Sequence, residues 1–288
     1  MRETQALFID SGFYWFNTGP GLYTVRPDSY LKYSMTTLGL LETDTLYDDL
    51  RAEYGSYGQM FARYFDGLEG GLQYRYYDVQ NLQLPEHVDE CDAYLITGSK
   101  AGVYDSDPWI SRLQTWIADF HQRGAKIIGI CFGHQILAHS LGGLAAKSDK
   151  GWGVGVHSTT LLPDDELTIS SDKADPQNSR QNSEQSSHRG KLSLIYSHQD
   201  QVQKLPPGAQ LLASSDFCRY AAFKIDDRIL SFQGHPEFTP EYLQRLLHRR
   251  KQAIGEARYA KAIASLGKPT DEQSVGRRLL DFIHHEPL

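Results

Sequence analysis

Residues 126–135 decide the fold of this chain, and they read KIIGICFGHQ. An apolar, β-branched run meets two glycines, Gly129 and Gly133, that flank Cys131, and a helical pattern follows. This arrangement predicts a nucleophile elbow, a sharp turn from strand to helix that presents one side chain at the carboxyl end of a sheet. The glycines relieve crowding at such a turn. Because a helix begins directly after the sulfur, its free N–H groups and dipole favour the thiolate, so we expect Cys131 to be reactive.

The composition is that of an ordinary globular protein, with 288 residues of which 40% are hydrophobic and 23% are charged. A formal net charge of -7 argues against a nucleic-acid partner, because no basic stripe offsets the acidic excess. No apolar run is long enough to span a bilayer, and residues 6–9 are too few for the apolar core of a secretory signal. We therefore expect no membrane partner and a cytoplasmic location. The scattered cysteines, Cys91, Cys131 and Cys218, predict neither a disulfide framework nor a metal site.

The domain organisation is predicted to be an N-terminal extension, residues 1–34, followed by one domain, residues 35–288. The extension is rich in aromatic residues and glycine but shows no sustained period, so we assign it no role. A simple extension and a lid or oligomerisation arm both stay open. Residues 170–190 are polar and nearly free of large apolar side chains, which predicts a mobile loop within the domain. Residues 268–288 are expected to contain a C-terminal helix.

Strand and helix patterns alternate through the first half of the domain, which predicts an α/β fold with a mostly parallel sheet. The expected elements are a strand at 38–44, a helix at 58–65, strands at 72–79 and 95–99, a helix that Asp107 caps ahead of Pro108, the elbow strand, and an elbow helix that stops at Gly142 and Gly143.

The second half of the domain changes character and predicts an antiparallel β addition, followed by helices. Strands are expected at 151–157, 192–196, 210–213, 219–223 and 228–232. A helix follows from Thr239. We interpret the basic cluster at 248–251 as its solvated end, with a binding patch as the alternative. Thr270 and Gln273 form a capping-box pattern for the last helix.

A reactive cysteine needs a base, and the base needs an orienting group. The segment His235-Pro236-Glu237 supplies both directly after the apolar strand at 228–232, so it is expected at the same sheet edge as Cys131. Proline fixes the backbone between the two polar side chains. We therefore predict a triad of Cys131, His235 and Glu237. The alternative is that His235 is a loop histidine and Cys131 a buried structural thiol.

Acyl transfer also needs an oxyanion site, because negative charge develops on the former carbonyl oxygen. The backbone N–H of Phe132 follows the nucleophile. A second donor is expected at the turn of Gly98 and Ser99, which ends a neighbouring strand. The alternative for Gly98 is a tight turn and nothing more.

Two motifs now carry a resemblance to a known family: Gly-Ile-Cys-Phe-Gly-His-Gln at 129–135 and Gly-His-Pro-Glu at 234–237. Together they resemble the class I (triad) glutamine amidotransferases, over roughly residues 36–250. Residues 96–99, the helix start at 107–110 and residues 197–202 add weaker matches. The combination is highly specific, whereas each piece alone is not.

The resemblance implies a flavodoxin-like α/β sheet, flanked by helices and carrying a small antiparallel β addition. It implies hydrolysis of a γ-glutamyl amide through a thioester on Cys131, with His235 as general base and acid, without metal or organic cofactor. The substrate-binding residues that it implies are Ser99, Gln135, His198 and Gln199. For His198 and Asp200, a loop that its own hydrogen bonds stabilise is the alternative.

Three functional hypotheses follow from the sequence. The first is a stand-alone amidotransferase-like hydrolase acting on glutamine, with a separate synthetase or acceptor subunit as a partner. The second is a γ-glutamyl peptidase that cleaves γ-glutamyl peptides or conjugates. The third belongs to another class, a non-catalytic regulatory or binding subunit that retains the fold.

Overall fold

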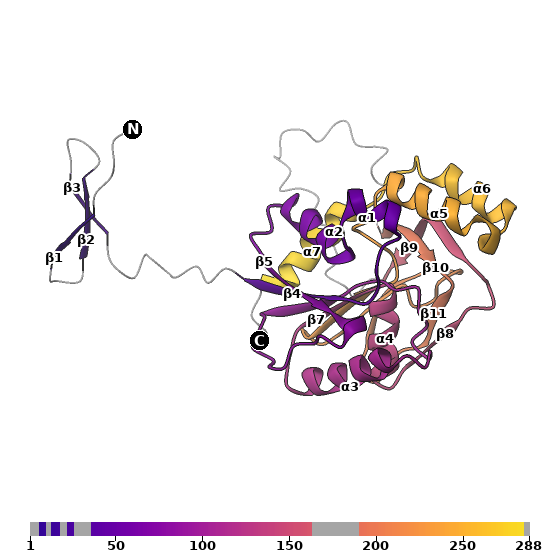
Figure 1. The fold of residues 1–288 in the computed structure, drawn as a ribbon, viewed down its shortest axis with the longest axis horizontal. Helices are drawn as coiled ribbons and strands as arrows, with labels where there is room; N and C mark the ends of the chain where they lie inside the picture. Colours follow the sequence, from indigo (N-terminus) through magenta and orange to yellow (C-terminus); the bar gives the residue numbers. More distant parts are fainter. Residues whose placement is uncertain (1–5, 10–12, 18–21, 26–35, 163–189, 285–288) are drawn as a thin grey trace. The chain divides into compact units, whose positions relative to one another are not determined.

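A computed structural model describes residues 6–9, 13–17, 22–25, 36–162 and 190–284 of the chain. The chain divides into two compact units, Met1–Met35 and Thr36–Leu288. The first contains an antiparallel sheet in the order β1-β2-β3, formed by Ala6–Ile9, Phe13–Asn17 and Leu22–Val25 (Figure 1). Sequence periodicity did not predict these strands, because each has only four or five residues.

The second unit is built on a nine-stranded sheet in the order β10-β9-β12-β13-β14-β7-β6-β4-β5. Its last five strands in this order run parallel to one another. They are β14 (Ile229–Phe232), β7 (Ile127–Ile130), β6 (Ala93–Ile96), β4 (Thr37–Glu42) and β5 (Gln73–Asp78). The parallel order places the carboxyl ends of β14, β7 and β6, and thus the segments that follow them, at one edge of the sheet.

Four antiparallel strands extend the same sheet beyond β14. They are β13 (Ala222–Ile225), β12 (Gln210–Ser214), β9 (Gly153–Leu161) and β10 (Lys191–His198). A separate two-stranded sheet pairs β8 (Leu144–Lys147) with β11 (Asp200–Lys204), neither of which was predicted. The strand predicted at 219–223 was placed too early: β13 starts at Ala222, after a turn in which Ser215 N–H donates to the Cys218 carbonyl.

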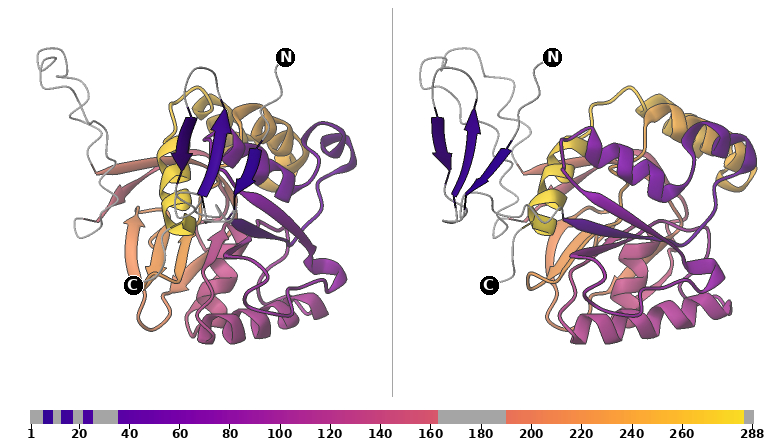
Figure 2. Two further views of the ribbon diagram at one scale, coloured as in Figure 1. Left: turned by 90° about the vertical axis from the view of Figure 1, so that its left-hand side faces the viewer. Right: turned by 60° about the vertical axis from the view of Figure 1, so that its left-hand side comes forward.

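Helices cover both faces of the sheet, with α3 and α4 on one side and α2 and α7 on the other (Figures 1 and 2). The helices are α1 (Asp48–Tyr54), α2 (Tyr57–Asp66), α3 (Pro108–Gln122), α4 (Phe132–Ser140), α5 (Pro240–Ile254), α6 (Glu256–Ser265) and α7 (Glu272–His284), with a short 3-10 turn η2 (Val79–Asn81). Successive strand residues pack alternately against the two layers: Leu40 lies in the cluster with α2 and α7, and Leu41 in the cluster with α3 and α4. The predicted α/β fold is confirmed.

The helix predicted to open at Asp107 and Pro108 starts there, but two predicted capping interactions are absent among the described residues. Asp107 precedes α3, but its side chain makes no capping hydrogen bond. The last helix starts at Glu272, and its first intrahelical bond runs from the Val275 N–H to the Asp271 carbonyl. The Thr270 hydroxyl donates to the Glu272 carboxylate, so it does not form the predicted capping box with Gln273. No helix of the described residues is long and apolar enough to cross a membrane. The loop predicted at 170–190 falls outside the described residues, except for Gly190.

Candidate active site

Cys131 occupies the turn between β7 and α4 with φ 56° and ψ -101°. Residues other than glycine rarely adopt this backbone conformation. Its N–H donates to the Phe232 carbonyl at 2.9 Å, and its own carbonyl accepts from Gln135 N–H at 3.0 Å. These bonds hold a conformation that costs about 1–3 kcal/mol and that is typical of functional sites. The turn therefore holds Cys131 as the nucleophile-elbow pattern predicts.

The flanking glycines allow strand and helix to approach at this turn. A Cβ on Gly129 would lie 2.5 Å from the Gly133 carbonyl oxygen, and one on Gly133 would lie 2.2 Å from the Ile96 oxygen. Both distances are too short for any side chain. The Gly-x-Cys-x-Gly spacing is thus a packing requirement of the elbow.

His235 follows β14 at the same sheet edge, and the backbone and a ring fix its orientation. Its N–H donates to the Ile195 carbonyl at 2.7 Å, and its imidazole stacks on Phe238 with centroids 3.8 Å apart and an interplanar angle of 7°. Its Nδ1 lies 2.7 Å from Glu237 Oε1, and both side chains are buried. This bond leaves Nε2 available to Cys131.

The electrostatics of His235 favour the imidazolium. Burial lowers the pKa of His235, but the charges of Glu237 and Cys131 and hydrogen bonds to both outweigh that effect and raise it above its ordinary value. Glu237 Oε2 is buried without a partner in the part of the chain that the structure describes. Glu237 therefore contacts His235 through Oε1 alone among the described residues, and the triad stays a prediction.

The turn after β6 brings Gly98 beside both side chains. The position of a Cβ on Gly98 would lie 3.0 Å from His235 Cε1 and 3.6 Å from Cys131 Cβ. Among the described residues the Gly98 N–H has no acceptor, and the Phe132 N–H belongs to the first turn of α4, where no intrahelical partner exists. Both predicted oxyanion donors are therefore without an acceptor among the described residues.

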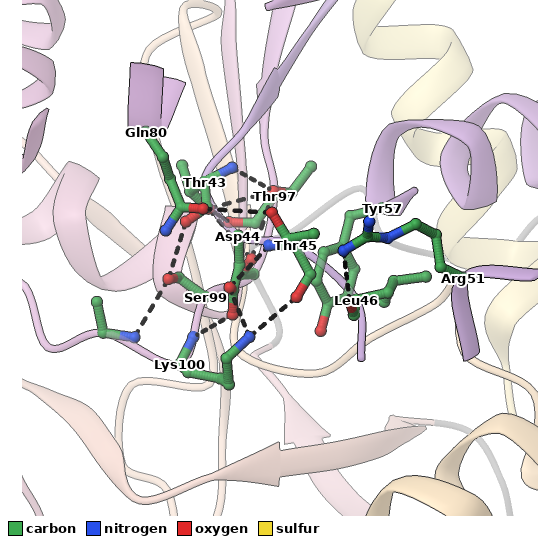
Figure 3. Close-up of polar contacts among 12 residues, drawn as sticks. Thr43, Asp44, Thr45, Leu46, Arg51, Tyr57, Gln80, Thr97, Ser99 and Lys100 are labelled. Carbon is green, nitrogen blue, oxygen red and sulfur yellow. Dashed lines mark hydrogen bonds and ion pairs between the residues drawn. The ribbon is translucent and has the colours of Figure 1, made fainter. Parts of the chain in front are cut away.

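A polar network from the loop after β4 joins Thr43 to Thr97 and Ser99, the residues on either side of Gly98 (Figure 3). Thr43 Oγ1 lies 3.1 Å from the carbonyl oxygens of both Thr97 and Gly98, and Ser99 Oγ donates to the Thr43 carbonyl at 3.0 Å. Sequence reasoning missed Thr43, because its role depends on a residue 54 positions away.

Asp44 and Lys100 form the second part of this network (Figure 3). The buried Asp44 carboxylate accepts the Lys100 N–H at 2.8 Å and the Lys100 ammonium at 2.5 Å. Lys100 Nζ also donates to the Thr45 carbonyl at 3.0 Å. The acidic end of the 38–44 segment was the available signal, but it did not reveal the partner.

A cavity of about 350 Å³ opens onto Cys131. All four predicted substrate-binding residues line it, together with residues that the sequence analysis did not predict to bind substrate. Its lining consists of Ser99, Lys100, Ala101, Gly102, Tyr104, Asp105, Cys131, Gln135, Lys147, Trp152, Ser197, His198, Gln199, Asp200 and Arg250.

Gln135 and His198 are anchored from the same side of the cavity. Gln135 Nε2 donates to the Asp200 carbonyl at 2.8 Å and to Gln233 Oε1 at 3.1 Å. His198 Nδ1 lies 2.8 Å from the same carbonyl, and burial lowers the pKa of His198 to about 3. His198 is therefore neutral, and its Nε2 is buried without a partner among the described residues. Gln199 contributes its backbone, whose carbonyl accepts from Ser148 N–H.

The histidine inside the elbow motif has a structural role. His134 Nδ1 lies 2.9 Å from Ser231 Oγ, and Nε2 lies 2.9 Å from the Tyr220 carbonyl. Burial lowers the pKa of His134 to about 3, so the ring stays neutral. It ties α4 to β14, and it does not line the cavity.

The basic cluster at 248–251 was predicted to be a solvated helix end, with a binding patch as the alternative, and Arg250 does not fit the first of these. Arg250 lines the cavity, and its Nη1 donates to Ser197 Oγ at 3.1 Å. Its neighbour Arg249 fits the prediction better, since it forms an ion pair with the half-exposed Asp49. Helical spacing places these adjacent arginines in different directions, which composition alone does not resolve.

Comparison with known proteins identifies the family of the chain. The family model described as glutamine amidotransferase class-I matches residues 52–251. The chain belongs to the class I glutamine amidotransferase family. Among its relatives, gamma-glutamyl peptidase 3 of Arabidopsis thaliana is 32% identical over 69% of this chain and 76% of its own length. A glutamine amidotransferase-like protein of Schizosaccharomyces pombe is 28% identical over 85% of this chain and 98% of its own.

The fold of this family member also has solved counterparts. The crystal structure of a glutamine amidotransferase from Thermotoga maritima superposes with a TM-score of 0.65, covering 87% of this chain and 99% of the other. The two sequences are only 16% identical, so this likeness concerns the fold. The predicted family membership is confirmed, and the chain is an amidotransferase-like enzyme of class I. Among the described residues no group of His, Cys, Asp or Glu is arranged to hold a metal ion.

Proposed function

We propose that this amidotransferase-like enzyme hydrolyses γ-glutamyl amide bonds through a thioester on Cys131. The observation that carries the proposal is Cys131 at a positive-φ elbow beside the buried pair of His235 and Glu237. A cysteine, a base and an orienting carboxylate in this order make a nucleophilic triad. The two free N–H groups of Gly98 and Phe132 supply the electrostatic stabilisation that a tetrahedral intermediate needs, each worth about 3 kcal/mol.

The reaction begins with attack of the Cys131 thiolate on the γ-carbonyl carbon, and the carbonyl oxygen becomes an oxyanion held by Gly98 and Phe132 N–H. His235 donates its Nε2 proton to the amide nitrogen, the C–N bond breaks, and the amine or ammonia leaves. Water then attacks the thioester while His235 removes a proton from it. The C–S bond breaks, and glutamate and the thiolate are released.

The glutamyl group is proposed to lie in the cavity of about 350 Å³ that opens onto Cys131. Gln135, His198, Ser99 and Gln199 all line this cavity and give it a polar wall. Since His198 is neutral, it adds no charge to this wall. The same residues would serve glutamine and γ-glutamyl peptides alike, because the two substrate classes share the glutamyl group.

A γ-glutamyl peptidase is the second candidate. It is favoured by the gamma-glutamyl peptidase relatives, at 32% and 30% identity, and by a cavity of about 350 Å³ beside the nucleophile. For the glutamine hydrolase, ammonia would pass to a separate synthetase or acceptor subunit. For the peptidase, water alone accepts the glutamyl group.

The proposal is tested by trapping and turnover together. Cys131→Ala is expected to abolish hydrolysis of glutamine and of γ-glutamyl dipeptides while leaving the unfolding midpoint unchanged. The wild-type chain should form a covalent adduct at Cys131 with a glutamine-analogue electrophile, identified by peptide mass. Retained turnover in Cys131→Ala would refute the mechanism. No adduct, alone or with a candidate synthetase, would favour the non-catalytic subunit, and a strong glutamine preference would defeat the peptidase.

A further inference from the structure

Arg250 is a cation of the cavity without an acidic partner among the described residues. Three cationic side chains line the cavity: Lys100, Lys147 and Arg250. Lys100 is neutralised by Asp44. Burial raises the pKa of Asp200, and the charge of Lys147 opposes that rise, so these two groups interact. Arg250 forms no ion pair with any residue that the structure describes.

The guanidinium of Arg250 is held in place without being neutralised. Nη1 donates to the buried Ser197 Oγ at 3.1 Å, and the group lies 5.8 Å from the centroid of the Trp152 ring. Ser197 comes from β10 and Trp152 from the segment before β9, so three parts of the chain fix it. An arginine has five N–H donors in a planar fork, and one of them is used here. The remaining donors are suited to a carboxylate.

The position of Arg250 relative to His235 indicates which part of a substrate it reaches. A second, smaller cavity of about 20 Å³ lies against Gly98 and His235. Only four residues line both cavities among those described: Ser99, Cys131, Ser197 and Arg250. Arg250 therefore lies where the substrate cavity meets the His235 side of the nucleophile, whereas Gln135 and Lys147 line only the larger cavity.

The direction of proton transfer completes the inference. His235 must protonate the leaving nitrogen, so the amine departs on the side of Cys131 that faces His235. We propose that Arg250, positioned by Ser197 and Trp152, binds a carboxylate of the leaving amine. This rests on the proposed γ-glutamyl hydrolysis and specifies its substrate class: γ-glutamyl derivatives of amino acids or peptides. Ammonia, the amine of glutamine, carries no carboxylate for Arg250.

The test compares two substrates that differ only in that carboxylate, γ-glutamyl-alanine and γ-glutamyl-alaninamide. A charged hydrogen bond is worth about 1.5–3 kcal/mol, so the wild-type kcat/KM should favour the free acid by about 10- to 150-fold. Arg250→Gln should remove this preference, because it should slow the acid about 10- to 150-fold more than it slows the amide or glutamine. Arg250→Lys should restore part of the preference, because the charge remains and the fork is lost.

Arg245→Gln is the matched control, since Arg245 lies in the same helix but pairs with Asp49 and Glu53. It should leave the preference intact. Equal wild-type turnover of acid and amide would overturn the proposal. The proposal would also be overturned if Arg250→Gln lowered kcat/KM equally for acid, amide and glutamine at an unchanged unfolding midpoint. Arg250 would then bind the glutamyl group that all three substrates share.

Failure of the proposed function itself gives a different result. The wild-type chain would then turn over none of the three substrates, or Cys131→Ala would retain turnover, and the assignment of Arg250 would fall with it. If Arg250→Gln lowers the unfolding midpoint, two other measurements test the assignment: the ratio of kcat/KM for acid to that for amide in the wild type, and the same ratio in Arg250→Lys. The assignment is refuted if the wild type shows no preference for the acid, or if Arg250→Lys leaves that preference unaltered.

Discussion

Replacing Glu237 with glutamine tests the electrostatic core of the site. Glu237→Gln keeps the size of the side chain and an oxygen beside His235 Nδ1, but it removes the negative charge. In the native protein the Nδ1–Oε1 distance is 2.7 Å and both side chains are at most 3% exposed. Solvent therefore does not screen the pair.

The magnitude follows from two comparisons within the molecule. Burial without a neighbouring carboxylate lowers the pKa of His134 and of His198 to about 3. Burial acts on His235 in the same direction, and Glu237 is the first of the effects that oppose it. Loss of the charge should thus move the pKa of His235 downward and remove the imidazolium near pH 7. At about 1.5–3 kcal/mol for one charged hydrogen bond, kcat/KM should fall about 10- to 150-fold.

The assay is the pH dependence of Cys131 alkylation by iodoacetamide, followed by peptide mass, together with kcat/KM on a γ-glutamyl substrate. In Glu237→Gln, alkylation at pH 7 should slow, because the thiolate has lost its imidazolium partner. Cys91 and Cys218 should react little, since burial raises the pKa of both thiols. Glu241→Gln, in the first turn of α5 and exposed, is the control. An unchanged alkylation profile with kcat/KM within threefold of wild type would refute this account of His235.

Three further predictions concern the surrounding scaffold. Gly133→Ala should lower the free energy of unfolding in urea by about 1–3 kcal/mol, because its Cβ would lie 2.2 Å from the Ile96 carbonyl oxygen. Gly267→Ala is the control: the space around Gly267 is open, so the free energy of unfolding should change little. Thr43→Val should lower kcat more than it raises KM, about tenfold, by releasing the Gly98 turn; a change confined to KM would contradict this. The unfolding free energy should fall as pH drops from about 6.5 towards 3, because His134 binds a proton in the unfolded chain that the buried ring does not bind. In His134→Gln, the slope of unfolding free energy against pH should be smaller by up to about 1.4 kcal/mol per pH unit.

Some features of this protein depend only on residues that are close together in the sequence. The elbow was predictable because Gly129, Cys131 and Gly133 act within one turn, and the chain needs no distant partner to form it. His235 and Glu237 are two residues apart, and their hydrogen bond follows from that short separation. The parallel sheet was predictable for a related reason, since apolar runs and helical periodicity alternate along the chain.

Tertiary structure decided the features that depend on distant contacts. Thr43 meets Gly98 across 55 positions, Asp44 meets Lys100 across 56, and Arg250 meets Ser197 across 53. No spacing rule connects such pairs, because their approach depends on how neighbouring strands and helices pack. Residues 248–251 show the difference most clearly: the sequence shows a basic helix end, but only the packing of α5 beside β10 separates an arginine in the cavity from an arginine paired at the surface. The proposed nucleophile and its base were therefore predictable from the sequence, whereas the cavity proposed to bind their substrate is a property of the fold.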